Sequence, residues 1–264
     1  MDKEKHLASL AQLKDTQMRI RDIHPIFDIS YPVAIVKEGK FFIYDIPLGC
    51  TEYRFIKSEP CPYSLPAGVR AAFPMECYGD KMAAVVTEDV FDSLQGYITI
   101  LHEFVHCAQG MSCGMQLKDQ LEISKEYKRK KDYMWEINHP FPYEGKAFTD
   151  LYAKYMDALS QSDIQRIKFI RGQLARLLSK QDAEYLLWQE WKEGFPRFLE
   201  NKICKRFQMM ENHRGNEEPF SRTSFYESGS RYIQVIEGYS PIIAADMERL
   251  FEEMQGSMFG DIEE

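Results

Sequence analysis

The segment that most constrains this chain is an apolar stretch, residues 97–109, that carries the pattern His-Glu-x-x-His. The apolar residues around the pattern recur at helical spacing and predict a buried helix from about Ser93 to Gln109. Residues four apart lie above one another on a helix, so His102 and His106 can present two imidazole nitrogens to one metal ion. Glu103 follows the first histidine directly and can take a proton from a water beside that metal. The alternative is a pair of ordinary core histidines on one helix.

A catalytic zinc site usually has three protein ligands and one open position, so a third ligand is needed. Two downstream glutamates, Glu193 and Glu144, are each followed by a glycine that can let the backbone pass close to the metal-bearing helix. Glu193 is favoured because Arg197 and Glu200 follow at four and seven positions and share its helix face. Arg197 can hold Glu193 in place, and Glu200 can accept a hydrogen bond from a ligand imidazole. The alternative for Glu193 is an exposed helix charge paired with Arg197.

The rest of the chain separates into a strand-rich start and a helical remainder. Two β-hairpins are predicted, one over residues 31–44 and one over residues 69–87. Further helices are expected at about 7–23, 116–131, 144–159, 163–179, 182–207, 225–237 and 241–254. The fold class is therefore α+β and mainly helical, with a small antiparallel sheet beside a helical body.

Three segments in the same order along the chain resemble the zinc signature of the gluzincin metallopeptidases. His102-Glu-Phe-Val-His106 followed by Trp191-Lys-Glu193-Gly-Phe resembles the aminopeptidase branch of that clan, whose later Asn-Glu-Gly-Phe-Ala segment supplies the third zinc ligand. Ser224-Phe-Tyr226-Glu-Ser-Gly229 resembles that branch's Tyr-x-Lys-Gly segment, whose tyrosine stabilises the tetrahedral intermediate. The resemblance implies a zincin-like catalytic domain that binds Zn²⁺ and hydrolyses peptide bonds. It also implies the oxyanion role of Tyr226, for which Tyr232, Tyr239 and His213 are the alternatives.

The chain departs from this family pattern in its spacing and in two residues. The 87 positions between His106 and Glu193 are more than the family needs, so we expect a helical insertion in about 112–180. The whole chain, 1–264, is then one domain. Its sheet and zinc helix lie in about 25–110, and the lobe with the third ligand lies in about 181–264. Ser228 stands where the family has lysine. Pro196 should kink the helix after Glu193 unless it lies in the first turn.

The segment before the zinc helix offers two features that suit a peptide substrate. Phe73-Pro-Met75-Glu76-Cys resembles the Gly-x-Met-Glu-Asn loop that binds a substrate's free amino end in the aminopeptidases, the alternative being a plain hairpin with an exposed Glu76. The strand Met82 to Thr87 is expected to be the sheet edge along which an extended peptide aligns.

Composition narrows the class of partner. A net charge of −8 argues against nucleic acid, and the one basic run, residues 128–131, closes a polar helix. No apolar run has the length of a membrane span, and the first residues do not resemble a signal peptide, so we expect a cytoplasmic location.

The six cysteines lack Cys-x-x-Cys spacing and are expected to be thiols, with disulfides as the alternative. We expect a zinc peptidase that acts on peptides or proteins, and the alternative is a non-catalytic binding protein that retains a zinc site. The oligomeric state is not constrained.

Overall fold

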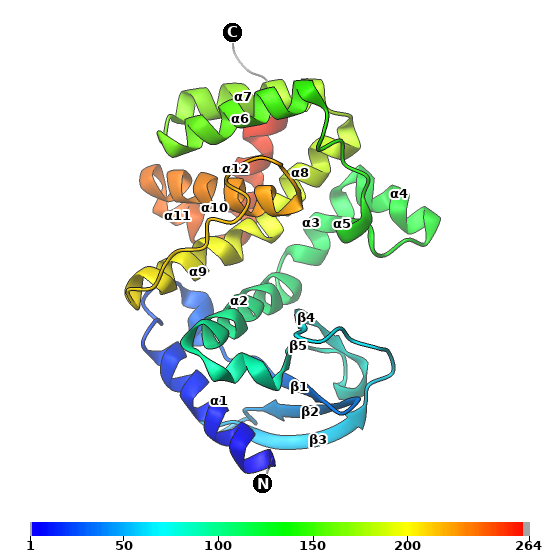
Figure 1. The fold of residues 1–264 in the computed structure, drawn as a ribbon, viewed down its shortest axis with the longest axis vertical. Coiled ribbons are helices and arrows are strands. Elements are labelled where there is room, and N and C mark those ends of the chain that lie inside the picture. Colours follow the sequence, from blue (N-terminus) through cyan, green and yellow to red (C-terminus); the bar gives the residue numbers. More distant parts are fainter. Residues whose placement is uncertain (1, 261–264) are drawn as a thin grey trace. The chain divides into compact units, whose positions relative to one another are not determined.

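The computed structural model describes residues 2–260, and the fold is α+β and mainly helical, as predicted. The chain divides into two compact units (Figure 1). The first unit comprises Met1–Ser112 and Leu199–Glu211, and the second comprises Cys113–Phe198 and Asn212–Glu264.

The first unit combines a sheet with helices. Its elements are α1 (Asp2–Met18), η1 (Pro25–Asp28), β1 (Val33–Lys37), β2 (Lys40–Asp45), β3 (Arg54–Pro60), β4 (Arg70–Met75), η2 (Glu76–Tyr78), β5 (Lys81–Thr87), η3 (Glu88–Asp92) and α2 (Leu94–Met111), together with part of α9 (Gly194–Arg206).

Both predicted hairpins are present. β1 and β2 are joined by Glu38 and Gly39, whose φ angles of 50° and 69° are both positive. A two-residue turn with two positive φ angles matches the twist of the flanking strands. β4 and β5 form the second hairpin, whose turn includes η2 and Gly79, also at positive φ.

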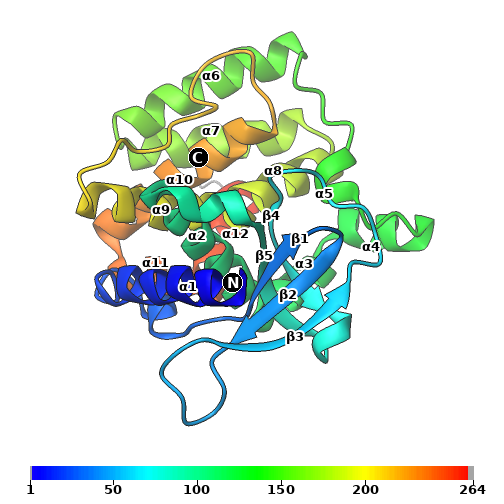
Figure 2. The same cartoon turned by 60° about the horizontal axis from the view of Figure 1, so that its bottom comes forward.

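The sheet is mixed, so the prediction of a purely antiparallel sheet is wrong in one ladder. The strand order is β3-β2-β1-β5-β4, and β1 pairs in parallel with β5 (Figure 2). β5 is therefore an interior strand, and the prediction that Met82 to Thr87 forms the edge is also wrong. The reason is visible in its burial, because residues 83–86 are all buried and an interior strand is covered on both faces. The edges are β4 and β3, and β3 was not predicted because charged residues break its apolar alternation.

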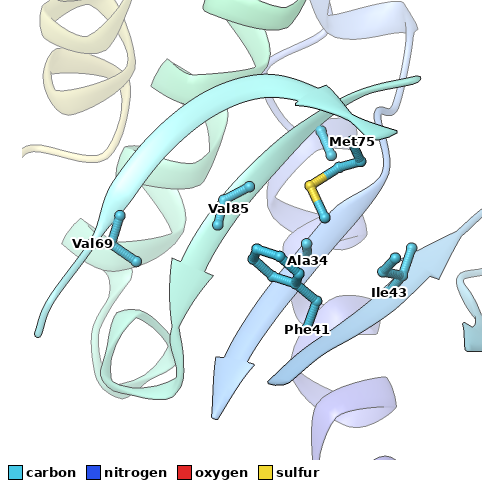
Figure 3. Close-up of a cluster of buried hydrophobic side chains, with 7 residues drawn as sticks. Ala34, Phe41, Ile43, Val69, Met75 and Val85 are labelled. Carbon is cyan, nitrogen blue, oxygen red and sulfur yellow. The ribbon is translucent and has the colours of Figure 1, made fainter. Parts of the chain in front are cut away.

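The two faces of the sheet pack against different parts of the first unit. α2 packs against β4 and β5 on one face. On the opposite face lies a cluster of buried side chains from four strands and the residue before β4, and Figure 3 shows them with helices passing behind the strands. Its members are Ala34, Phe41, Ile43, Val69, Met75, Ala83 and Val85. Two buried faces let this small sheet hold α2 in a fixed position.

The second unit is helical. Its helices are α3 (Gly114–Gln120), α4 (Glu122–Lys130), α5 (Trp135–Asn138), α6 (Lys146–Ser160), α7 (Ile164–Leu177), α8 (Lys180–Lys192), α10 (Arg222–Tyr239), α11 (Pro241–Ala244) and α12 (Met247–Phe259), with the start of α9.

Three of the predicted long helices are each divided in two. The division that matters for function separates α8 from α9 at Glu193, which is the C-cap residue of α8. Pro196 is the third residue of α9 and so lies in its first turn, where a missing backbone N–H costs no intrahelical hydrogen bond. The proline therefore begins a new helix instead of kinking a continuous one.

A buried ion pair fixes α8 within this unit. The side chains of Arg171 on α7 and Glu190 on α8 are both completely buried and form a salt bridge. Tyr155 donates to the same carboxylate at 3.0 Å, and Ser228 donates to it at 2.6 Å. Since Glu190 lies one turn before Glu193, this network holds the end of α8 that bears the proposed ligand.

Candidate metal centre

The two histidines of the pattern lie on α2 as predicted. The helix begins with Ser93, whose hydroxyl accepts a hydrogen bond from the backbone N–H of Gly96 at 3.2 Å. Near the far end of the helix, Gly110 lies against the end of the Met82 side chain of β5, which a Cβ there would approach to 2.9 Å. The imidazole rings of His102 and His106 have centroids 5.0 Å apart. The four-residue spacing thus places both rings on one side of α2.

The Nδ1 atom of each imidazole faces an oxygen acceptor. His102 Nδ1 lies 2.9 Å from the carboxylate of Glu200, and His106 Nδ1 lies 2.9 Å from the side-chain oxygen of Gln109. We assign the proton to Nδ1 in both rings because each neighbouring oxygen can only accept. That tautomer leaves Nε2 as the nitrogen with a lone pair, which is the form in which histidine binds a metal.

Glu200 forms the hydrogen bond that the sequence predicted, whereas Gln109 was missed. Gln109 is completely buried and lies three residues after His106 on the same helix. A polar residue at that spacing on an otherwise apolar helix was the available signal, because residues three apart on a helix are neighbours.

Glu103 is a buried carboxylate, only 6% exposed. Among residues 2–260, no side chain or backbone N–H donates a hydrogen bond to it, and no basic side chain lies within ion-pair distance. A carboxylate that no neighbour occupies can accept a proton from a water molecule.

Glu193 is the downstream glutamate that joins the histidines. His102, His106 and Glu193 are grouped as a candidate metal site in the described part of the chain, with one ligand atom from each residue within 4.8 Å of the others. Two imidazole nitrogens and one carboxylate oxygen form a donor set that suits Zn²⁺. Glu144 is exposed in the turn before α6 and does not belong to this group.

The glycine after Glu193 makes a close backbone contact within the second unit. A Cβ on Gly194 would lie 2.7 Å from the Cα of Gly229, and a Cβ on Gly229 would lie 2.1 Å from the backbone oxygen of Glu190. The close approach that the structure shows is to α10, and the predicted approach to the metal-bearing helix stays a prediction. Two glycines let the segment with Glu193 and the segment with Tyr226 pack backbone against backbone.

Tyr226 lies near Glu193 within the second unit. Burial is the main cause that raises the pKa of its hydroxyl well above the ordinary value, and the negative charge of Glu193 adds to the effect. The Tyr226 hydroxyl is therefore protonated at neutral pH and able to donate a hydrogen bond.

Arg197 was expected to hold Glu193. Its guanidinium donates to the backbone oxygen of Arg214 at 2.7 Å and lies 5.3 Å from the centre of the Tyr226 ring. The Arg197–Glu193 ion pair stays a prediction.

The alternatives to Tyr226 have other partners. Tyr232 is completely buried beside the Arg171 guanidinium, and Tyr239 donates to Glu253 at 2.8 Å. His213 lies 2.9 Å from the buried carboxylate of Glu227.

Two further predictions concern exposed positions and thiols. Glu76 is exposed in η2, in the turn of the β4–β5 hairpin, so the structure gives it the surroundings of an ordinary hairpin residue. The six cysteines are free thiols, as their spacing predicted.

In comparisons with known proteins, no family model, curated protein or solved structure matches this chain. Within residues 2–260, none of the helices combines the length and apolar character needed to cross a membrane.

Proposed function

We propose that this protein is a zinc-dependent peptidase with a zincin-like active site, in which His102, His106 and Glu193 hold the metal. The observation that carries the proposal is the orientation of the two imidazoles. The N–H of any buried imidazole needs an acceptor, and a metal ligand needs that N–H at one nitrogen and a lone pair at the nitrogen that faces the metal. Both rings here have an acceptor at Nδ1, at 2.9 Å in each case.

A Zn²⁺ ion in such a site lowers the pKa of a water molecule toward neutrality and polarises a carbonyl group. Glu103 accepts the proton of the attacking water and then delivers it to the nitrogen of the cleaved bond. The absence of a donor to its oxygens among residues 2–260 supports this role, because no competing hydrogen bond holds the carboxylate.

Tyr226 donates a hydrogen bond to the oxygen that becomes negative during attack. Its proximity to Glu193 supports this role, and its hydroxyl, like that of any tyrosine, is protonated at neutral pH. The substrate is a peptide or a protein, and the zincin-like assignment of the fold rests on the motif order together with this site.

The test begins with the metal. Protein purified without chelator should contain close to one zinc per chain by elemental analysis, and His106→Ala should lose most of it. The zinc-loaded protein should cleave members of a mixed peptide library, and a chelator should stop this cleavage.

Glu103→Gln separates a peptidase from a protein that only binds metal. The glutamine keeps the size of the side chain but cannot accept the proton, so turnover should fall by about 10²–10⁴-fold or more while zinc content is retained. Glu144→Gln, a change at an exposed glutamate, is the matched control and should retain activity. Cleavage that survives in Glu103→Gln would refute this mechanism, and tightly bound zinc with no cleaved peptide would favour a metal-binding protein without catalysis.

A further inference from the structure

We infer that this peptidase prefers substrates with a carboxylate one or two residues from the cleaved bond, and that Arg222 binds this carboxylate. The inference rests on the proposed function, because it takes Tyr226 to face the reacting carbonyl. The residues that carry it all lie in the second unit.

Arg222 lies one helical turn from Tyr226. It is the first residue of α10, four positions before Tyr226, and its guanidinium carbon is 5.8 Å from the centre of the Tyr226 ring. Four helical residues rise by about 6 Å, and an extended peptide advances by about 3.4 Å per residue. Arg222 therefore reaches a substrate position one or two residues away from the carbonyl that Tyr226 contacts.

The guanidinium of Arg222 is weakly held by the protein. It has five N–H donors, yet within residues 2–260 its one hydrogen-bond acceptor is the backbone oxygen of Glu136, at 3.3 Å. That oxygen already accepts from Tyr185 at 3.1 Å and from Gln189 at 2.8 Å, so Arg222 is a third donor to an atom with two lone pairs. The carboxylate of Glu136 pairs with Lys118 instead. Most of the donors of Arg222 are thus available to a ligand.

The stability of α10 does not explain an arginine at this position. A positive charge at the first residue of a helix opposes the helix dipole, and the first turn of α10 contains no acidic residue to compensate. An arginine that neither favours its own helix nor pairs with a carboxylate is better explained by a ligand with negative charge.

The charges around Tyr226 favour such a ligand. The guanidinium carbon of Arg222 lies 5.8 Å from the centre of this ring, and its positive charge has no carboxylate partner among residues 2–260. The nearby negative charge is Glu193, which a bound cation would neutralise. The site would then attract an acidic substrate despite the net charge of −8 on the whole chain.

The experiment compares two mixed peptide libraries that are identical except that every Glu in one is Gln in the other. Turnover is measured with the zinc-loaded wild type, and retention is measured on immobilised zinc-loaded Glu103→Gln protein, which binds without cleaving. We expect both measurements to favour the Glu library by about 10–100-fold, the contribution expected for hydrogen bonds to a charged group.

Variants of Arg222 then identify the residue responsible. Arg222→Gln should bring the ratio between libraries close to one, and Arg222→Lys should retain part of the preference because it keeps the charge but loses the bidentate geometry. Arg176→Gln, a change at an exposed arginine of α7, should retain the wild-type ratio. Thermal unfolding of each variant checks that the fold is intact.

The outcomes for the two proposals are distinct. Equal use of both libraries by the wild type, or a preference that persists in Arg222→Gln, would overturn the role of Arg222. Absence of turnover on both libraries with zinc bound would count against the proposed peptidase, while the retention ratio would still decide whether Arg222 binds carboxylates.

Discussion

The buried pair of Arg171 and Glu190 should have a large coupling energy, and a double-mutant cycle can test this. Both side chains are completely buried, whereas the pairs at the surface are partly exposed to water. Glu190→Gln keeps the shape of the side chain and an oxygen that can accept from Tyr155 and Ser228. It removes the negative charge and replaces the oxygen that accepts from Arg171 by an amide N–H₂ group, so the buried guanidinium loses both its counter-charge and this acceptor.

The size of the effect follows from burial. Removing one partner of a buried ion pair costs about 3–5 kcal/mol, because the remaining charge stays in a poorly solvated place. Arg171→Met should cost a similar amount, and it also removes the hydrogen bonds to Ser257 at 2.8 Å and to the backbone oxygen of Met254 at 3.0 Å. The double variant contains no unpaired charge, so its cost should lie at least about 3 kcal/mol below the sum of the two single costs.

Urea unfolding followed by tryptophan fluorescence is the appropriate assay. All three tryptophans, Trp135, Trp188 and Trp191, are buried in the second unit and report on its unfolding. The free energy of unfolding in water is obtained by linear extrapolation for the wild type and the three variants. Additive effects, with a coupling energy below about 0.5 kcal/mol, would refute the reasoning, because that is the behaviour of independent sites. A reduced slope of the transition would show a change in cooperativity and would require a second spectroscopic probe.

Three further predictions concern the metal site and the acid stability. Glu193→Ala should weaken zinc binding severely in a zinc titration and Glu144→Ala should leave it near wild type, and the opposite order would move the third ligand. Glu200→Gln and Gln109→Leu should each weaken zinc affinity by about 10–100-fold with the fold retained, and unchanged affinity in both would contradict the assigned tautomers. Burial acts to raise the pKa of Glu136, but nearby lysine ammonium groups outweigh it and lower the pKa below the ordinary value. The carboxylate therefore stabilises the fold above the unfolded pKa of about 4.3, and this contribution is lost as the pH falls through the lower folded value. Glu136→Gln should accordingly flatten the acid side of a stability curve measured by urea unfolding, and an unchanged acid limb would contradict this assignment.

The helix that bears the histidines could be predicted because its signals are local. Apolar spacing, a Ser93 cap and the His-Glu-x-x-His pattern all lie within one stretch of chain, and the observed bounds of α2 differ from the prediction by one or two residues. The two hairpins were predicted for the same reason, since their turns have residues that accept positive φ angles.

Strand order could not be predicted from such local signals. The parallel pairing of β1 with β5 joins segments about fifty residues apart, and nothing in either segment specifies the other as its partner. β3 was missed because Arg54, Lys57 and Glu59 interrupt its apolar pattern, a composition typical of an edge strand. The edge assigned to Met82 to Thr87 was wrong because a run of small and branched apolar residues was not weighed as evidence of burial on both faces.

The two imidazoles of the site depend on the fold to different extents. Gln109 lies on α2 itself, so any chain that forms this helix brings its amide to His106. Glu200 lies 98 residues after His102, so the acceptor of the first imidazole arrives only when α9 packs in the folded unit. The partners also differ in charge, and the anion of Glu200 raises the basicity of its imidazole more than the neutral amide of Gln109 can. A His-Glu-x-x-His pattern on an isolated helix would therefore orient one ligand only, and the acceptor for the other ligand comes from Glu200 on α9.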